Sequence, residues 1–103
     1  MFMGNYVGKE VNANYIDDVA YIGRLCFYEE FYEYKADSVN SKINMGRIYY
    51  KDIKNILNIN TIGIIPNALL IELYDGRKYE YVVINRKGIK KFLETQREKY
   101  KGE

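Results

Sequence analysis

The side chains that could carry out covalent or acid–base chemistry are few in this chain of 103 residues. Cys26 is the single cysteine, and a catalytic thiol needs an activating base, for which histidine is the usual residue. The chain contains no histidine, which also excludes most zinc, haem and non-haem iron sites. Cys26 lies between Leu25 and Phe27 in a strand-like segment, where a cysteine is usually a small structural residue. We therefore predict that the protein is not an enzyme.

The acidic residues and glycines do not form the patterns that hold metal ions or phosphates. Glu29, Glu30, Glu33 and Asp37 are close in the sequence, but they lack the loop spacing of a Ca²⁺ or Mg²⁺ site, and a soluble turn is the simpler interpretation. No glycine-rich run ends in Gly-Lys-Ser or Gly-Lys-Thr, as a phosphate-binding loop does. We expect no metal, no cofactor and no small-molecule substrate.

The charged residues are distributed unevenly along the chain. Residues 1–75 contain 7 basic and 10 acidic side chains, whereas residues 76–103 contain 9 basic and 4 acidic ones. The overall net charge of +2 is too small to predict nucleic-acid binding. The basic segment is a candidate contact for an anionic membrane surface through Lys90, Lys91, Arg97 and Lys101. Glu94 and Glu98 lie three or four positions from these cations, so a solvated helix face is the alternative interpretation.

Twelve tyrosines supply large side chains with a polar tip, which suit both core packing and protein contacts. Tyr21, Tyr34 and Tyr81 stand where strand alternation is expected to point them inward. Six further tyrosines cannot all point inward, because neighbouring residues of a strand face opposite sides. These six form a candidate surface for a protein partner or a second copy of the chain: Tyr28, Tyr32, Tyr49, Tyr50, Tyr74 and Tyr79.

Alternation with β-branched and aromatic residues predicts short β-strands over most of residues 10–84. The expected strands cover residues 11–15, 19–27, 31–36, 45–50, 54–60, 69–73 and 79–83. Turn-forming residues separate them at Asp17-Asp18, Glu29-Glu30, 37–41, Lys51-Asp52 and 63–67. Asp75-Gly76 stands between two alternating runs, which is typical of a two-residue hairpin turn with both residues at positive φ.

The period of the apolar residues changes to that of a helix near residue 86. Ile89, Phe92, Leu93, Gln96 and Tyr100 fall on one face of a helix over about residues 86–101. We expect Asn85 to cap its start and Gly102 to follow its end. The apolar face is expected to pack against the open end of the strand assembly through Ile89, Phe92, Leu93 and Tyr100.

Five segments resemble the GRAM-type branch of the pleckstrin-homology (PH) superfamily, including its small bacterial members. They are Ala13-Asn14-Tyr15, Gly23–Phe27, Tyr32-Glu33-Tyr34, Ile48–Ile53 and the hairpin Leu69–Val83. The chain departs from the family pattern in having Tyr28 after the second strand, Leu69 for the first isoleucine of the hairpin and Tyr81 for its phenylalanine. The resemblance implies a mainly β (α+β) fold: a barrel of about seven antiparallel strands, in two nearly orthogonal sheets, capped by one C-terminal amphipathic helix.

The resemblance also implies binding of a phosphoinositide or of a protein. Lipid-binding members place lysines and arginines on the first two strands and on the loop between them. The corresponding loop here is Ile16-Asp17-Asp18, with Arg24 and Lys9 as the nearby cations, and two carboxylates there would repel a phosphate. We therefore expect a non-catalytic binding module that acts through a protein partner or by self-association. The alternative is a peripheral membrane adaptor that binds anionic lipid through its basic helix.

A single domain over residues 1–103 is expected from the chain length, with residues 1–9 flexible. The apolar stretches are far shorter than the about 20 residues that span a membrane. Residues 1–9 lack the pattern of a signal peptide. Together with a lone reduced thiol, these features predict a cytoplasmic location.

Overall fold

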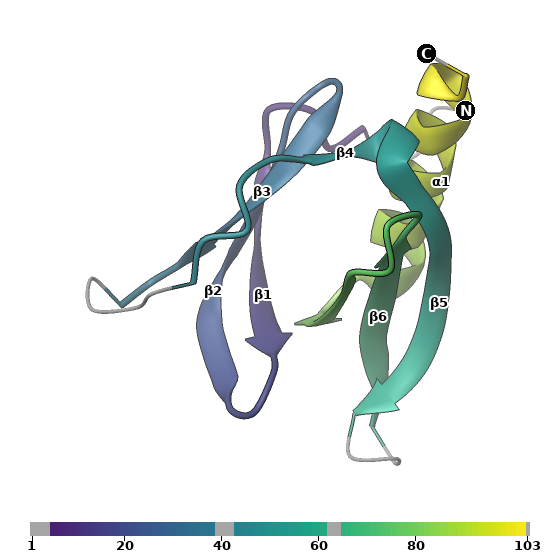
Figure 1. Ribbon diagram of the computed structural model, residues 1–103. Coiled ribbons are helices and arrows are strands. Elements are labelled where there is room, and N and C mark those ends of the chain that lie inside the picture. The colour runs from purple at the N-terminus through teal and green to yellow at the C-terminus, as the bar shows by residue number, and fades with distance from the viewer. Residues whose placement is uncertain (1–4, 39–42, 62–64, 103) are drawn as a thin grey trace.

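The computed structural model describes residues 5–38, 43–61 and 65–102. Within these ranges the chain forms seven β-strands, one 3₁₀ turn and one α-helix (Figure 1). In chain order they are β1 (Glu10–Ile16), β2 (Ala20–Phe27), β3 (Phe31–Ala36), β4 (Ile48–Tyr49), η1 (Tyr50–Asp52), β5 (Ile53–Thr61), β6 (Ile65–Leu73), β7 (Lys78–Val83) and α1 (Arg86–Tyr100). The mainly β fold with one C-terminal helix is confirmed.

The strands form one antiparallel sheet in the order β4-β3-β2-β1-β7-β6-β5, which curls into a nearly closed barrel. Neighbours in the sheet are neighbours in sequence except for β1 and β7, where Ala13 pairs with Val83 and Tyr15 with Tyr81. This pairing joins β1–β4 to β5–β7, which face each other in Figure 1. The two separate sheets expected from the sequence are therefore two halves of one continuous hydrogen-bonded sheet.

The core fills the barrel and extends to α1, which covers its open end. Ile89, Phe92 and Leu93 are buried, as their helical spacing predicted. Tyr100 is only half-buried and lies at the rim, so its predicted place in the core is wrong; Gln96 is the buried residue of the last two turns. The barrel contributes mainly aromatic and branched side chains, among them Leu25, Phe27, Tyr32, Tyr34, Ile48, Tyr50, Ile53, Leu69, Ile71, Leu73, Tyr81 and Val83.

Local signals set both ends of α1. The Asn85 side chain accepts a hydrogen bond from the Gly88 amide at 3.2 Å, which satisfies one of the free amides of the first turn. Gly102, two residues after the helix, has φ of 87°, a conformation that glycine adopts without strain. The helix thus begins and ends within a residue of the predicted bounds.

The segment before β1, part of the stretch expected to be flexible, contacts the barrel. The Gly8 amide donates to the Phe27 carbonyl at 2.8 Å, and the Phe27 amide donates to the Lys9 carbonyl at 3.0 Å. The Tyr6 ring packs against Phe27 and Phe92, with ring centroids 5.7 and 5.5 Å away. Residues 5–9 therefore belong to the fold, and residues 1–4 lie outside the described residues.

The β6–β7 hairpin is present, but its turn differs from the predicted one. Gly76 has φ of 96° and its amide donates to the Leu73 carbonyl at 3.0 Å, so Tyr74 and Asp75 are the two central residues. The Leu73 amide in turn donates to the Arg77 carbonyl at 2.8 Å. This is a three-residue loop with glycine at its left-handed position.

Two further boundaries differ from the predicted ones. Of the strand expected over residues 45–50, only Ile48–Tyr49 pairs with β3, and Tyr50 begins η1. The turn expected over residues 63–67 is wrong for residues 65–67, because β6 already begins at Ile65; residues 62–64 lie outside the described ones. Pro66 is tolerated there because it stands next to the start of its strand.

Candidate functional site

Two of the six candidate surface tyrosines lie inside the barrel. Tyr32 and Tyr50 are 1% and 0% exposed, so their assignment to a partner surface is wrong. The Tyr81 hydroxyl lies 3.1 Å from that of Tyr32, and either can donate in this hydrogen bond; it also lies 3.1 Å from the Met45 sulfur, a weak acceptor. Burial raises the pKa of both Tyr32 and Tyr81. These phenols stay neutral and serve as hydrogen-bonded core residues.

Tyr50 is a further hydrogen-bonded core residue, and it lies next to the β2–β3 hairpin. Its hydroxyl donates to the Tyr28 carbonyl at 2.7 Å, and burial raises its pKa. Strand parity identifies the error at Tyr32, since residues two apart share a face and Tyr34 was already expected to point inward. Tyr34 is buried and donates to the Tyr21 carbonyl at 2.9 Å, which confirms its inward position.

A partly exposed cluster lies at the start of β3, on the side of that strand away from the core. We call it the aromatic patch: Tyr28, Phe31, Arg47 and Tyr49. The rings of Tyr28 and Phe31 stack with centroids 4.8 Å apart, and Tyr49 lies 5.4 Å from Phe31. The Arg47 guanidinium carbon is 4.5 Å from the Phe31 centroid, a cation–π distance. The sequence identified Tyr28 and Tyr49 but missed Phe31 and Arg47; the outward parity of Phe31 was the available signal.

The remaining two candidate tyrosines do not join the aromatic patch. Tyr74 is 69% exposed in the β6–β7 loop. Tyr79 is half-buried against the core, with its ring 6.1 Å from that of Tyr15. The six candidate tyrosines therefore divide into two core residues, two patch residues and two separate positions.

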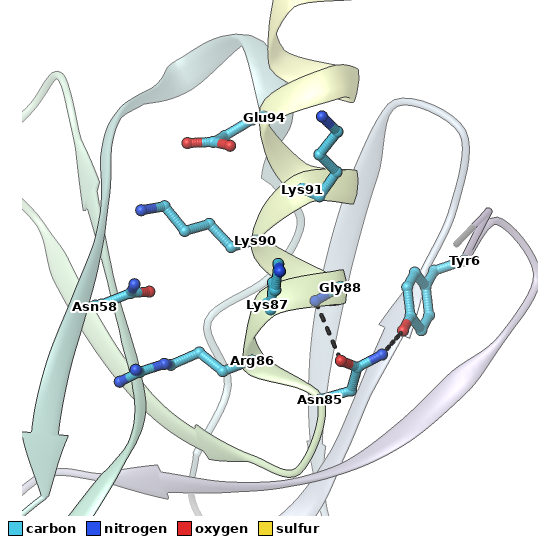
Figure 2. Close-up of a pocket in the computed structure, with 9 residues that line it drawn as sticks. All are labelled: Tyr6, Asn58, Asn85, Arg86, Lys87, Gly88, Lys90, Lys91 and Glu94. Atoms are coloured by element: carbon cyan, nitrogen blue, oxygen red, sulfur yellow. Dashed lines mark hydrogen bonds between the residues drawn. The ribbon is translucent and has the colours of Figure 1, made fainter. Parts of the chain in front are cut away.

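The first two turns of α1 border an open groove of about 810 Å³ (Figure 2). Figure 2 shows Arg86, Lys90 and Glu94 extending from α1 toward the strand that carries Asn58. The full lining is Tyr6, Asn58, Asn85, Arg86, Lys87, Gly88, Lys90, Lys91 and Glu94. This groove thus has four cations and one carboxylate. The sequence identified Lys90 and Lys91 but missed Arg86 and Lys87, which occupy the first turn of the same basic helix.

The basic residues of this groove lack carboxylate partners. The Arg86 guanidinium donates to the backbone carbonyl of Ile59 at 3.0 Å, which is a neutral acceptor. Lys87, Lys90 and Lys91 form no ion pair with any residue that the structure describes. The groove therefore keeps a net positive charge.

The last two turns of α1 are instead tied to the barrel, mainly through Glu29 at the tip of the β2–β3 hairpin. The Glu29 carboxylate accepts from Lys99 and from the Tyr100 hydroxyl, both at 2.5 Å, and its backbone carbonyl accepts from Gln96 at 2.6 Å. The hydrogen bond from Lys99 is the main reason that the pKa of Glu29 is lowered. Arg97 donates to the Lys54 carbonyl at 2.8 Å.

The four candidate lipid contacts consequently have different surroundings. Lys90 and Lys91 line the groove, Arg97 is held by β5, and Lys101 lies 3.9 Å from the Glu98 carboxylate. The structure brings the first two together and separates them from the other two.

The β1–β2 loop, where lipid-binding relatives of the resembled family carry cations, is acidic in the folded chain too. Asp17 and Asp18 are exposed. Arg24 is engaged away from that loop, 2.8 Å from the Glu10 carboxylate and 3.5 Å from that of Asp37. A phosphate at this loop would meet carboxylates without a free arginine to balance them.

Cys26 is buried in β2, and burial raises the pKa of its thiol, which disfavours the reactive thiolate. No group of three or more acidic or cysteine side chains in residues 5–38, 43–61 and 65–102 is arranged to hold a metal ion. In the same ranges no helix has the length and apolar character needed to cross a bilayer.

The comparison with solved structures finds a similar fold in the crystal structure of the C-terminal domain of an unknown protein from Leishmania infantum. The two chains are 14% identical with a TM-score of 0.72, over 87% of this chain and 82% of the other. The architecture fits a PH-like barrel. No family model matches the chain, and no curated protein matches its sequence. At this identity the likeness concerns the fold alone.

Proposed function

We propose that the chain is a non-catalytic binding module of the GRAM-like kind that acts through a protein partner. The observation that carries this proposal is the aromatic patch of Tyr28, Phe31, Arg47 and Tyr49 on the outside of the barrel. Tyrosine, phenylalanine and arginine are enriched where proteins contact each other, because they combine large apolar area with polar groups.

The arrangement of the patch supports a role in contacts with another protein. The stacked Tyr28 and Phe31 rings and the overlying Arg47 limit one another's motion, so little side-chain entropy is lost on binding. The patch also adjoins β4, which ends the sheet order and has only two paired residues. A partner could contact the rings and the adjacent strand edge together. The partner is either a different protein or a second copy of this chain.

The chemistry of the buried groups supports a role without catalysis. The phenols of Tyr32, Tyr50 and Tyr81 have raised pKa values because they are buried. The Cys26 thiol is shifted in the same direction. Each of these groups therefore stays protonated at neutral pH, which suits packing better than nucleophilic attack.

The membrane-adaptor alternative has weaker geometric support. A flat bilayer would need Lys90, Lys91, Arg97 and Lys101 to face one plane. Arg97 is hydrogen-bonded to the Lys54 carbonyl, and Lys101 lies beside Glu98. Sedimentation with vesicles of equal parts phosphatidylserine and phosphatidylcholine tests this alternative, which predicts binding that high salt reverses.

The protein-binding proposal is tested by comparing three variants. Phe31→Ser and Arg47→Glu alter the aromatic patch, and Ile22→Ser removes an apolar side chain that is 67% exposed on β2. Light scattering measures self-association, and affinity capture from the source cell detects other partners. We expect at least one interaction that both patch variants lose and Ile22→Ser keeps. A monomeric chain whose captured proteins are the same with and without the patch would contradict the proposal.

A further inference from the structure

The groove beside the first two turns of α1 gathers four cations along one side of a helix. Six cations outside it face carboxylates, among them Arg24–Glu10, Arg77–Asp75 and Lys99–Glu29 at 2.8, 2.8 and 2.5 Å. In the groove, Arg86, Lys87, Lys90 and Lys91 have only Glu94 as an acidic neighbour in the lining, and none forms an ion pair with a described residue.

The basic residues of the groove are spaced along α1 so that like charges are neighbours on the helix surface. Arg86 and Lys90 are four positions apart on the helix, as are Lys87 and Lys91, and like charges at this spacing destabilise a helix. Arg86 and Lys87 also stand in the first turn, at the positive end of the helix dipole, where carboxylates rather than cations are favoured. An external anion would remove both penalties.

The groove has the volume of a binding site and a polar, charged lining. Its volume of about 810 Å³ lies in the range of ligand pockets. Its lining includes the neutral polar groups of Asn58 on β5 and of Asn85 and Tyr6, which are hydrogen-bonded to each other at 2.7 Å. These groups can hydrogen-bond to peptide amides while the cations pair with side-chain carboxylates.

We propose that this groove binds an extended acidic segment of a protein. The site is separate from the aromatic patch, and the proposal does not depend on the proposed function. A protein segment fits better than a bilayer because Arg86 and Lys90 are half-buried between α1 and β5 rather than raised above the surface. Glu94 at the far end of the lining would repel a carboxylate. The favoured segment therefore places its acidic residues at the start of α1 and a neutral or basic residue near Glu94.

The test uses a fluorescein-labelled oligoglutamate peptide and the full chain, with binding followed by anisotropy at low salt. The double variant Lys87→Glu/Lys90→Glu reverses two groove charges. Lys35→Glu/Lys51→Glu makes the same change in net charge at exposed positions outside the lining. We expect saturable binding that the groove variant weakens about tenfold or more and that the control changes about twofold or less.

A milder variant protects the test from a folding defect. Lys87→Gln/Lys91→Gln alters only exposed side chains and should weaken peptide binding about threefold while circular dichroism stays unchanged. Absence of saturable binding to the wild-type chain would overturn the proposal. So would equal losses in the groove and control variants, or equal binding of a glycine–serine peptide of the same length. Binding of phosphatidylserine vesicles, but not of the peptide, with loss in the groove variant would assign the groove to lipid instead.

Discussion

The two halves of α1 both carry basic residues but have different surroundings. The first half carries Arg86, Lys87, Lys90 and Lys91 beside an open groove, without ion pairs to the described residues. The second half is joined to Glu29 through Gln96, Lys99 and Tyr100. The basic helix therefore presents two surfaces, one that is tied to the barrel through Glu29 and one whose cations have no carboxylate partner among the described residues. The sequence does not show that Lys99 is engaged, because its partner Glu29 is about 70 positions away.

The largest expected effect concerns the buried apolar face of α1, to which Ile89, Phe92 and Leu93 contribute. Phe92 is 4% exposed and packs on Phe27 and Tyr50, with ring centroids 5.3 and 5.9 Å away. Phe92→Ala should lower the free energy of unfolding by about 3–5 kcal/mol, because it leaves a cavity between α1 and the barrel. Urea unfolding measures the change, with exposed Lys91→Ala as the control. A decrease in the free energy of unfolding below about 1 kcal/mol would show that packing of Phe92 does not hold the helix on the barrel.

The second prediction concerns a contact between the second half of α1 and the barrel. Gln96 is 7% exposed and donates to the Glu29 carbonyl at 2.6 Å. Gln96→Ala should lower the free energy of unfolding by about 1–2 kcal/mol, since the hydrogen bond is lost and packing is reduced. Glu98→Ala, at a side chain that is 71% exposed, should change stability by less than about 0.5 kcal/mol. Equal decreases in the free energy of unfolding for the two variants would contradict the claim that Gln96 stabilises the fold more than Glu98 does.

The third prediction uses pH. The pKa of Glu29 is lowered from 4.5, chiefly by the hydrogen bond from Lys99. A lowered pKa in the folded state adds stability that is present above pH 4.5 and is lost as the pH falls through the folded-state value. Glu29→Gln should therefore lower stability at neutral pH by about 0.5 kcal/mol, because the pair is half-exposed and screened.

The pH profile supplies the check on this assignment. The difference between wild type and Glu29→Gln should shrink as the pH falls below 4.5. Glu30→Gln is the matched control, since Glu30 is the exposed neighbour of Glu29 in the same hairpin and has no ion pair to the described residues. A difference that stays constant with pH would show that the Glu29 carboxylate does not stabilise the fold through its charge.

The smallest expected effect concerns the first half of α1, where we expect a substitution to increase stability. Lys91→Gln removes one member of the Lys87–Lys91 pair of like charges. Stability should rise by about 0.2–0.5 kcal/mol at low salt and less at high salt. Urea unfolding at two salt concentrations measures this, with Lys101→Gln expected to give no gain because Lys101 lies near Glu98. A loss of stability in Lys91→Gln would mean that the first half is structural as well.

Local patterns predicted most of the secondary structure. Alternation identified all seven strands of the described ranges, and Asn85 with Gly102 identified the helix ends. The turn at Asp75-Gly76 was placed correctly along the chain, but its geometry depends on the hydrogen bond between Gly76 and Leu73, which a dipeptide does not specify. The joining of β1 to β7 comes from residues about 70 apart, so the single continuous sheet was not visible from local spacing.

The candidate site was less predictable because it depends on which side chains neutralise each other. Parity could have placed Tyr32 in the core and Phe31 outside, since both lie in one regular strand. Tyr50 could not be placed this way, because the strand ends at Tyr49 and η1 begins. Likewise Lys90 and Lys101 look equivalent in sequence, and only the fold separates the groove from the end of the helix.

The claim that the two halves of α1 have different roles is tested most directly by nuclear magnetic resonance. Amide shifts of the labelled chain are followed while the oligoglutamate peptide is added at low salt. We predict saturable shifts at residues 86–91 and at Asn58, with residues 96–101 and Glu29 unchanged. Shifts of equal size along the whole helix, or shifts centred on residues 96–101, would contradict the account.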